Sequence, residues 1–334
     1  MSGLRRAVVT GGAGFIGSHL VDALLAHDVA VTVVDDFATG RMENLNHVAA
    51  RIVVERCDVN ETERLRGLFE HADTVFHLAG LADIVPSIER PTDYFRANVD
   101  GTQSVMEAAR AAGIQRVVYA ASSSCYGIPD GYPTAESAEI RPQYPYALTK
   151  YVGELVALHW SKVYRIPTVA LRLFNVFGVR SRTSGAYGSV FGVFLAQKLA
   201  GKPFTVVGDG TQSRDFTYVT DVARAFVMAA ESTVTGEAIN IGSGRPQTVN
   251  QLVALLGGDV VNVPKRPGEP DSTHADTTKA ARLLNWRTQV TFDQGVRYVL
   301  DNIDYWRAAP VWDEQSIANA TKIWFDQLGE TATA

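Results

Sequence analysis

Tyr146 and Lys150 stand four residues apart in a stretch of helical periodicity, so they share one face of the predicted helix. A tyrosine hydroxyl has a pKa of about 10 and is a poor base at neutral pH. A lysine ammonium and any positively charged ring bound nearby would favour the phenolate, which makes Tyr146 a candidate general base. Such a pair is also common on exposed helix faces, so the residues around it decide whether it is interpreted as catalytic.

Three hydroxyl side chains, Ser122, Ser123 and Ser124, follow an apolar run at residues 117–121. The run predicts a buried strand, and the carboxyl ends of parallel strands face the ligand crevice of an open α/β sheet. Serines are also turn formers, which is the structural alternative for this cluster. With Tyr146 expected nearby, Ser122 is predicted to be catalytic.

A glycine-rich segment at residues 10–17, Thr-Gly-Gly-Ala-Gly-Phe-Ile-Gly, separates a predicted strand from a predicted helix. Glycines there permit a tight turn and a close approach to a pyrophosphate, which the helix N-terminus can bind. The next strand ends in Asp35, near the offset at which a carboxylate accepts from the adenosine ribose. An acid there disfavours the extra phosphate of NADP, so NAD is predicted, although Arg41 lies just downstream.

The elements that must position these residues alternate along the first half of the chain as short apolar runs and amphipathic stretches. This order predicts a Rossmann-type, doubly wound parallel sheet of the α/β class with right-handed crossovers. We expect residues 1–175 to bind NAD, with a return near 215–245, and residues 176–334 to form mainly a smaller α/β substrate domain over the sheet's carboxyl edge. Helices are predicted at residues 15–25, 61–69, 93–112, 146–163, 189–200, 248–256 and 278–284, and a late strand at 238–241.

The C-terminal tail, residues 296–328, carries Trp306, Trp312 and Trp324. Their spacing is interpreted as a helix packed on the body of the protein and not as a ligand-binding group.

Composition excludes several classes of function. The 334 residues carry 31 Lys and Arg against 36 Asp and Glu, a net charge of −5, which argues against a nucleic-acid or anionic-membrane surface. No apolar run reaches the roughly 18 residues of a membrane helix. Cys57, Cys125 and scattered histidines form no disulfide framework and no metal-ligand spacing. Glycines interrupt the apolar stretch near the N-terminus, which argues against a signal peptide, so a cytoplasmic location is expected.

These motifs in this order resemble the extended short-chain dehydrogenase/reductase family, in particular its nucleotide-sugar epimerases. The resemblance also includes Cys-Asp-Val at 57–59, His-Leu-Ala-Gly at 77–80 and Arg-Leu-Phe-Asn-Val-Phe-Gly at 172–178. It implies a tightly bound NAD that is regenerated in each cycle. The residues implied for the cofactor are Gly11, Gly14, Phe15, Ile16, Gly17, Asp35, Asp36, Asp58, Val59, Leu78, Ala79, Gly80, Asn98, Tyr146, Lys150 and Val176.

Two segments of the second half resemble the family's grip on a nucleoside diphosphate. Arg214 lies in one, and Arg266 and Glu269 lie in the other. Guanidinium groups suit phosphate oxygens, and a carboxylate can accept from a ribose diol. The further residues implied for substrate are Ser123, Ser124, Asn175, Arg182, Ser189, Val190, Thr205, Val207 and Thr273.

The resemblance implies a 4-epimerase with Ser122, Tyr146 and Lys150 as its catalytic residues. A 4,6-dehydratase or uronate decarboxylase is the nearest alternative. Its relatives carry carboxyl groups where Ser123 and Ser124 stand, so net elimination is disfavoured. A non-catalytic NAD-dependent regulator on the same fold is the alternative from another class.

The sugar stays open between UDP-glucose, UDP-glucuronate and UDP-N-acetylglucosamine. Thr273 is small where some epimerases close the sugar pocket, which suggests room for an N-acetyl group. Arg182, with Ser123 and Ser124, could instead hold a C6 carboxylate. The resemblance also implies a homodimer formed by the predicted helices at 93–112 and 146–163.

Overall fold

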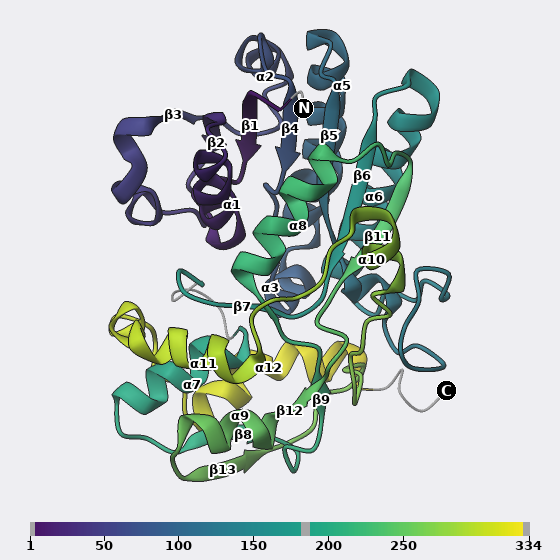
Figure 1. Ribbon diagram of the computed structural model, residues 1–334. Coiled ribbons are helices and arrows are strands. Elements are labelled where there is room, and N and C mark those ends of the chain that lie inside the picture. Colours follow the sequence, from purple (N-terminus) through teal and green to yellow (C-terminus); the bar gives the residue numbers. More distant parts are fainter. Residues whose placement is uncertain (1–3, 182–187, 330–334) are drawn as a thin grey trace.

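The computed structural model describes residues 4–181 and 188–329. Its centre is a parallel sheet of seven strands in the order β11-β6-β5-β4-β1-β2-β3 (Figure 1). This is the predicted Rossmann-type doubly wound topology, in which the strand order reverses next to the first strand. The strands are β1 (Arg6–Thr10), β2 (Ala30–Asp35), β3 (Ile52–Arg56), β4 (Thr74–His77), β5 (Arg116–Ser122), β6 (Thr168–Leu173) and β11 (Glu237–Ile241).

Helices cover both faces of this sheet because its strands are apolar on both sides. One core cluster joins the sheet to α1 and α8, and another joins it to α2, α5 and α6. The late strand predicted at residues 238–241 returns to the sheet as β11, in register with β6. The helices are α1 (Phe15–Ala26), α2 (Thr62–Phe69), α3 (Ile84–Glu89), α4 (Pro91–Phe95), α5 (Gly101–Ala112), α6 (Pro145–Tyr164) and α8 (Val219–Glu231).

A separate core cluster forms the lower part of the molecule in Figure 1. It packs under the carboxyl ends of the strands, and two capping boxes start its helices α9 and α11. Its strands are β8 (Phe204–Val207) and β13 (Val260–Val263), which pair with each other. Its helices are α7 (Val190–Leu199), α9 (Val249–Leu256), α11 (Phe292–Asp301) and α12 (Glu314–Leu328). Helix α10 (Thr278–Leu284) packs against the core of the large sheet instead. The short pairs are β7 (Val176–Phe177) with β10 (Thr217–Tyr218) and β9 (Ser213–Arg214) with β12 (Gln247–Thr248).

One predicted helix differs from the structure. The stretch at 93–112 is helical, but a π-helical turn, Arg96–Asp100, separates α4 from α5. A π turn adds a residue to the helix and redirects a side chain, and it often occurs at functional sites. Here it holds Asn98, which is buried.

Candidate active site

A cavity of about 710 Å³ lies between the carboxyl edge of the sheet and the lower part of the molecule. All but two of the residues predicted for cofactor and substrate border it. Arg182 is one exception, because it lies outside the described residues. Asn98 is the other, because it lies behind the cavity wall and does not border the cavity itself. The bordering residues are Gly11, Gly14, Phe15, Ile16, Gly17, Asp35, Asp36, Asp58, Val59, Leu78, Ala79, Gly80, Ser122, Ser123, Ser124, Tyr146, Lys150, Asn175, Val176, Ser189, Val190, Thr205, Val207, Arg214, Arg266, Glu269 and Thr273.

Asn98 supports the cavity wall from behind. Its side-chain oxygen accepts from the backbone N–H of Leu81 at 2.9 Å, and its amide nitrogen donates to the Leu81 carbonyl at 3.0 Å. The same nitrogen donates to the Thr149 hydroxyl at 3.0 Å. With its polar atoms used in this way, Asn98 fixes the loop after β4 against α6.

The glycine turn leads from β1 into α1. Gly11 has φ +71° and its N–H donates to the Val34 carbonyl at 2.8 Å. A Cβ at Gly17 would lie 2.1 Å from the Gly11 carbonyl oxygen, so this position requires glycine. At Gly14 the one close neighbour of a Cβ would be that same oxygen, at 3.1 Å. The turn therefore leaves an open cradle at the N-terminus of α1, which fits a pyrophosphate.

Asp35 ends β2 at the wall of the cavity and is buried. Its oxygens accept from the N–H groups of Ala13 at 3.0 Å and Phe37 at 2.9 Å. Burial raises the pKa of this carboxyl, while the two N–H groups act in the opposite direction. Each oxygen keeps a further lone pair, so Asp35 can still accept from a ribose hydroxyl.

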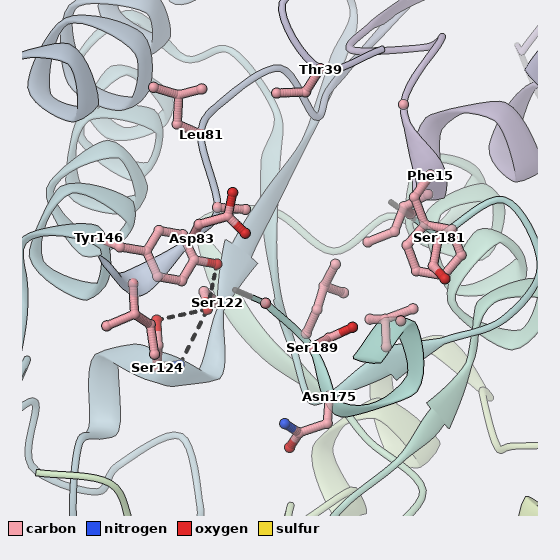
Figure 2. A pocket seen from close by; sticks show the side chains of 18 of the residues that line it. Phe15, Thr39, Leu81, Asp83, Ser122, Ser124, Tyr146, Asn175, Ser181 and Ser189 are labelled. Carbon is pink, nitrogen blue, oxygen red and sulfur yellow. Dashed lines mark hydrogen bonds between the residues drawn. The ribbon is translucent and has the colours of Figure 1, made fainter. Parts of the chain in front are cut away.

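The predicted catalytic side chains meet at the end of β5. The Tyr146 hydroxyl donates to Ser122 Oγ at 3.3 Å, and Ser122 Oγ lies 2.8 Å from Ser124 Oγ (Figure 2). The Ser124 N–H also donates to Ser122 Oγ at 3.2 Å. A short helical turn after β5 thus orients Ser122 toward α6, and the helix brings Tyr146 to it.

Lys150 lies one turn further along α6 and is buried. Burial lowers the pKa of its ammonium to about 8, and Glu154, another turn along, acts in the opposite direction. The ammonium lies 4.6 Å from the centroid of the Tyr119 ring. Glu154 in turn forms two hydrogen bonds with Arg172 of β6, at 2.6 and 2.9 Å.

The expected lowering of the Tyr146 pKa is not what the chain's own residues produce. Burial raises the pKa of the phenol, and the Asp83 carboxylate adds to this rise. The hydrogen bond with Ser122 favours the phenolate and only partly compensates. A lowered pKa of Tyr146 would therefore have to come from the positive nicotinamide ring of bound NAD.

The predicted diphosphate residues also come together. Arg214 lies 3.2 Å from Glu269, and Arg266 lies 3.9 Å from the same carboxylate. Both guanidinium groups are largely buried at the cavity wall. Thr273 is tied down, because its hydroxyl donates to Asn175 Oδ1 at 2.6 Å and accepts from the Asp215 N–H at 2.9 Å.

Several cavity residues were missed from the sequence. Asp83 lies beside Tyr146, and the buried Ser181 hydroxyl, near Phe15, has no hydrogen-bond partner within the described chain (Figure 2). The tail prediction is also incomplete, because Trp312 and Trp324 border the cavity in addition to packing. The sequence offered one signal for Asp83, which follows the 77–80 motif. A carboxylate shortly after the end of a strand is expected to lie at the crevice of the sheet.

Across 4–181 and 188–329, His, Cys, Asp and Glu side chains form no group that could hold a metal ion. Within the same ranges no helix combines the length and the apolar character needed to span a membrane.

A Rossmann-type sheet with a glycine turn and a Ser-Tyr-Lys set at its carboxyl edge is typical of dinucleotide-dependent enzymes. The model of the NAD dependent epimerase/dehydratase family matches residues 7–242, and the chain belongs to this family. A putative UDP-glucose 4-epimerase of Methanocaldococcus jannaschii is 34% identical over 301 residues, 88% of this chain and 97% of that protein.

Solved structures of nucleotide-sugar epimerases are also similar to this chain. The UDP-glucose 4-epimerase of Thermotoga maritima, in complex with UDP-glucose, has a TM-score of 0.84 and 32% identity over 90% of this chain and 98% of its own. The UDP-glucuronic acid 4-epimerase of Bacillus cereus, in complex with UDP-glucuronic acid and NAD, has a TM-score of 0.83 and 33% identity over 90% and 99%. A decarboxylase and a dehydratase are also among the similar proteins.

Proposed function

We propose that this protein is an NAD-dependent 4-epimerase of a UDP-linked hexose. The observation that carries the proposal is the hydrogen-bonded set of Tyr146, Ser122 and Ser124 at one end of the cavity, with Lys150 one helical turn away. The largely buried Arg214 and Arg266 lie at the wall of the same cavity and supply positive charge for a diphosphate.

The residues proposed to hold NAD are those of the glycine turn together with Asp35, Asp58 and Lys150. Bound there, NAD supplies the acceptor and donor of the hydride at C4 of the sugar. Tyr146 takes the proton of the 4-hydroxyl and returns it, and Ser122 hydrogen-bonds the reacting oxygen.

Inversion at C4 requires the oxidised sugar to present its other face while its nucleotide stays in place. Arg214 and Arg266 are proposed to hold the diphosphate during this rotation, since their charges lie at the wall of the cavity. Binding energy from these remote contacts keeps the sugar in reach of Tyr146 through both half-reactions. The upper half of the molecule would then serve the cofactor and the lower half the nucleotide sugar.

Epimerisation is favoured over dehydration or decarboxylation by Ser123 and Ser124. They stand beside Ser122 where a carboxyl group would be required to move a proton at C5 or C6. Serine hydroxyls can orient a sugar but are too weakly acidic for that step.

Asp83 lies at the reacting end of the cavity, close enough to Tyr146 to raise the pKa of its phenol. A sugar hydroxyl can donate to its carboxylate. We propose UDP-glucose, UDP-N-acetylglucosamine and UDP-glucuronate as the candidate substrates, and product analysis distinguishes them.

The test is incubation of the purified protein with these three nucleotide sugars, without added NAD, and identification of the products by NMR. Appearance of the 4-epimer is expected, and a 4-keto-6-deoxy sugar or a pentose would refute the assignment. Tyr146→Phe should abolish turnover while the protein keeps its NAD. Tyr164→Phe, the same change at the exposed end of α6, is the matched control and should remain active.

A homodimer through α6 is a further part of the proposal. Leu148 and Leu155 lie one heptad apart on α6 and are exposed, and Phe95 is exposed on α4. Apolar side chains at this spacing form a stripe that suits helix–helix contact. Sedimentation equilibrium should give twice the chain mass, and Leu155→Lys should shift it toward the monomer.

A further inference from the structure

The C-terminal segment crosses from the lower part of the molecule to the opposite wall of the cavity. At its start, the carbonyl of Trp312 accepts from the Gln197 amide of α7 at 2.8 Å. At its end, α12 packs against α3, which follows β4. Figure 1 shows α12 in yellow below α3, between the sheet and the lower elements.

One face of α12 is buried. It carries Ile317, Thr321 and Trp324, which recur at the i, i+4, i+7 spacing of a single helix face. Trp312 and Trp324 border the cavity from the two ends of this segment. The segment is thus part of the cavity wall.

Trp324 contacts the residues proposed to bind the diphosphate. Its indole N–H donates to the Pro267 carbonyl at 2.8 Å, and the Arg266 guanidinium lies 5.5 Å from its ring. This distance is within the range of a cation–π interaction. The guanidinium of Arg266 is therefore held between the indole ring and the Glu269 carboxylate.

Trp324 also connects to the catalytic end of the cavity through Tyr144. The two rings meet edge to face with centroids 6.3 Å apart, and Tyr144 stacks on Tyr146 with centroids 6.4 Å apart and planes 6° apart. Through Tyr144, Trp324 is thus two ring contacts away from Tyr146.

We propose that α12 is a cap on the nucleotide-sugar end of the cavity, and that Trp324 is a positioning residue that directs Arg266 toward the substrate diphosphate. This proposal rests on the proposed function, since it takes a UDP-sugar as the ligand. The cap acts on binding and on retention of the sugar, and the chemistry at C4 stays with Tyr146 and Ser122.

The experiment compares Trp324→Ala and Trp324→Phe with the wild type and with Lys322→Ala, an exposed position on the same helix. Calorimetry with UDP and steady-state kinetics with the active UDP-sugar are the measurements. Trp324→Ala is expected to raise both the Kd for UDP and the KM about tenfold, with kcat changed less than about twofold. Trp324→Phe keeps an aromatic face and should lie between, while Lys322→Ala should match the wild type.

Retention of the sugar gives a second measurement, which would not change if Trp324 only stabilised the fold. If the keto sugar leaves before it is reduced again, its C4 hydride stays on the cofactor. After substrate addition, reduced nicotinamide should therefore accumulate faster in Trp324→Ala than in the wild type, and its absorbance should rise faster.

The two proposals fail in different ways. A wild type that neither binds UDP nor epimerises a UDP-sugar refutes the proposed function. A wild type that does both, with a folded Trp324→Ala variant of unchanged Kd, KM and reduced-cofactor accumulation, refutes the cap alone.

Discussion

Replacing Lys150 with methionine is expected to stabilise the protein at pH 7 while it removes turnover. The ammonium is buried, and its pKa is lowered to about 8 from an ordinary value of 10.5. That difference corresponds to about 3 kcal/mol against the charged form at neutral pH. Methionine has a similar length and no charge, so it removes this cost.

The net gain is smaller because Lys150 also makes favourable contacts. Its ammonium lies over the Tyr119 ring, an interaction of about 1–2 kcal/mol when it is buried. We therefore expect Lys150→Met to raise the free energy of unfolding by about 1–2 kcal/mol. With an unfolding entropy of about 0.7 kcal/mol per kelvin for a chain of this length, Tm should rise by about 1–3 °C.

The pH dependence identifies the cause. The folded pKa of Lys150 lies below the unfolded one, so the unfolded state binds more protons between about pH 8 and 10.5. The cost is full below about pH 8 and disappears as the pH rises toward 10.5. The advantage of the methionine variant should accordingly be largest at pH 7 and decline above about pH 8.

Urea denaturation at several pH values is the assay, on proteins from which the nucleotide has been removed, because bound cofactor stabilises by mass action. Lys162→Met, an exposed position on the same helix, is the control and should change the free energy of unfolding by less than about 0.5 kcal/mol. A Lys150→Met variant less stable than wild type at pH 7, or an advantage that grows above pH 8, would refute the reasoning.

Three further changes probe the same region. Glu154→Gln leaves the buried Arg172 without its charged partner and should lower the free energy of unfolding by about 3–5 kcal/mol in urea titrations, whereas Glu154→Leu with Arg172→Met should recover most of the loss. Gly17→Ala places a Cβ against a backbone carbonyl, so it should lower stability by about 1–3 kcal/mol and reduce the NAD retained on purification. Asp83→Asn removes a negative charge that raises the pKa of Tyr146, so the acidic limb of the pH profile of kcat/KM should move to lower pH; an unchanged or higher limb would contradict this sign.

The sheet and the glycine turn could be predicted because local patterns determine them. Apolar runs at regular intervals predict parallel strands, and glycine suits position 17 because a Cβ there would overlap the Gly11 carbonyl oxygen. The position of Asn98 could not be predicted, because a π turn depends on packing between α6 and the loop after β4. The contact of Trp324 with Pro267 could not be predicted, because it joins residues that are far apart in the chain.

The residues around Tyr146 explain why its motif is meaningful here although the bare pattern is common. Lys150 follows at one helical turn and Glu154 at the next, so a phenol, an ammonium and a carboxylate lie along one face of α6. Arg172 then neutralises the anion from β6, with two charge-assisted hydrogen bonds. An ammonium this deeply buried would otherwise lose its proton more readily, and the carboxylate of Glu154 holds its pKa higher than burial alone would leave it. The spacing of Tyr, Lys and Glu by four residues, with an Arg on the next strand, is thus a more specific sequence signal than Tyr and Lys alone.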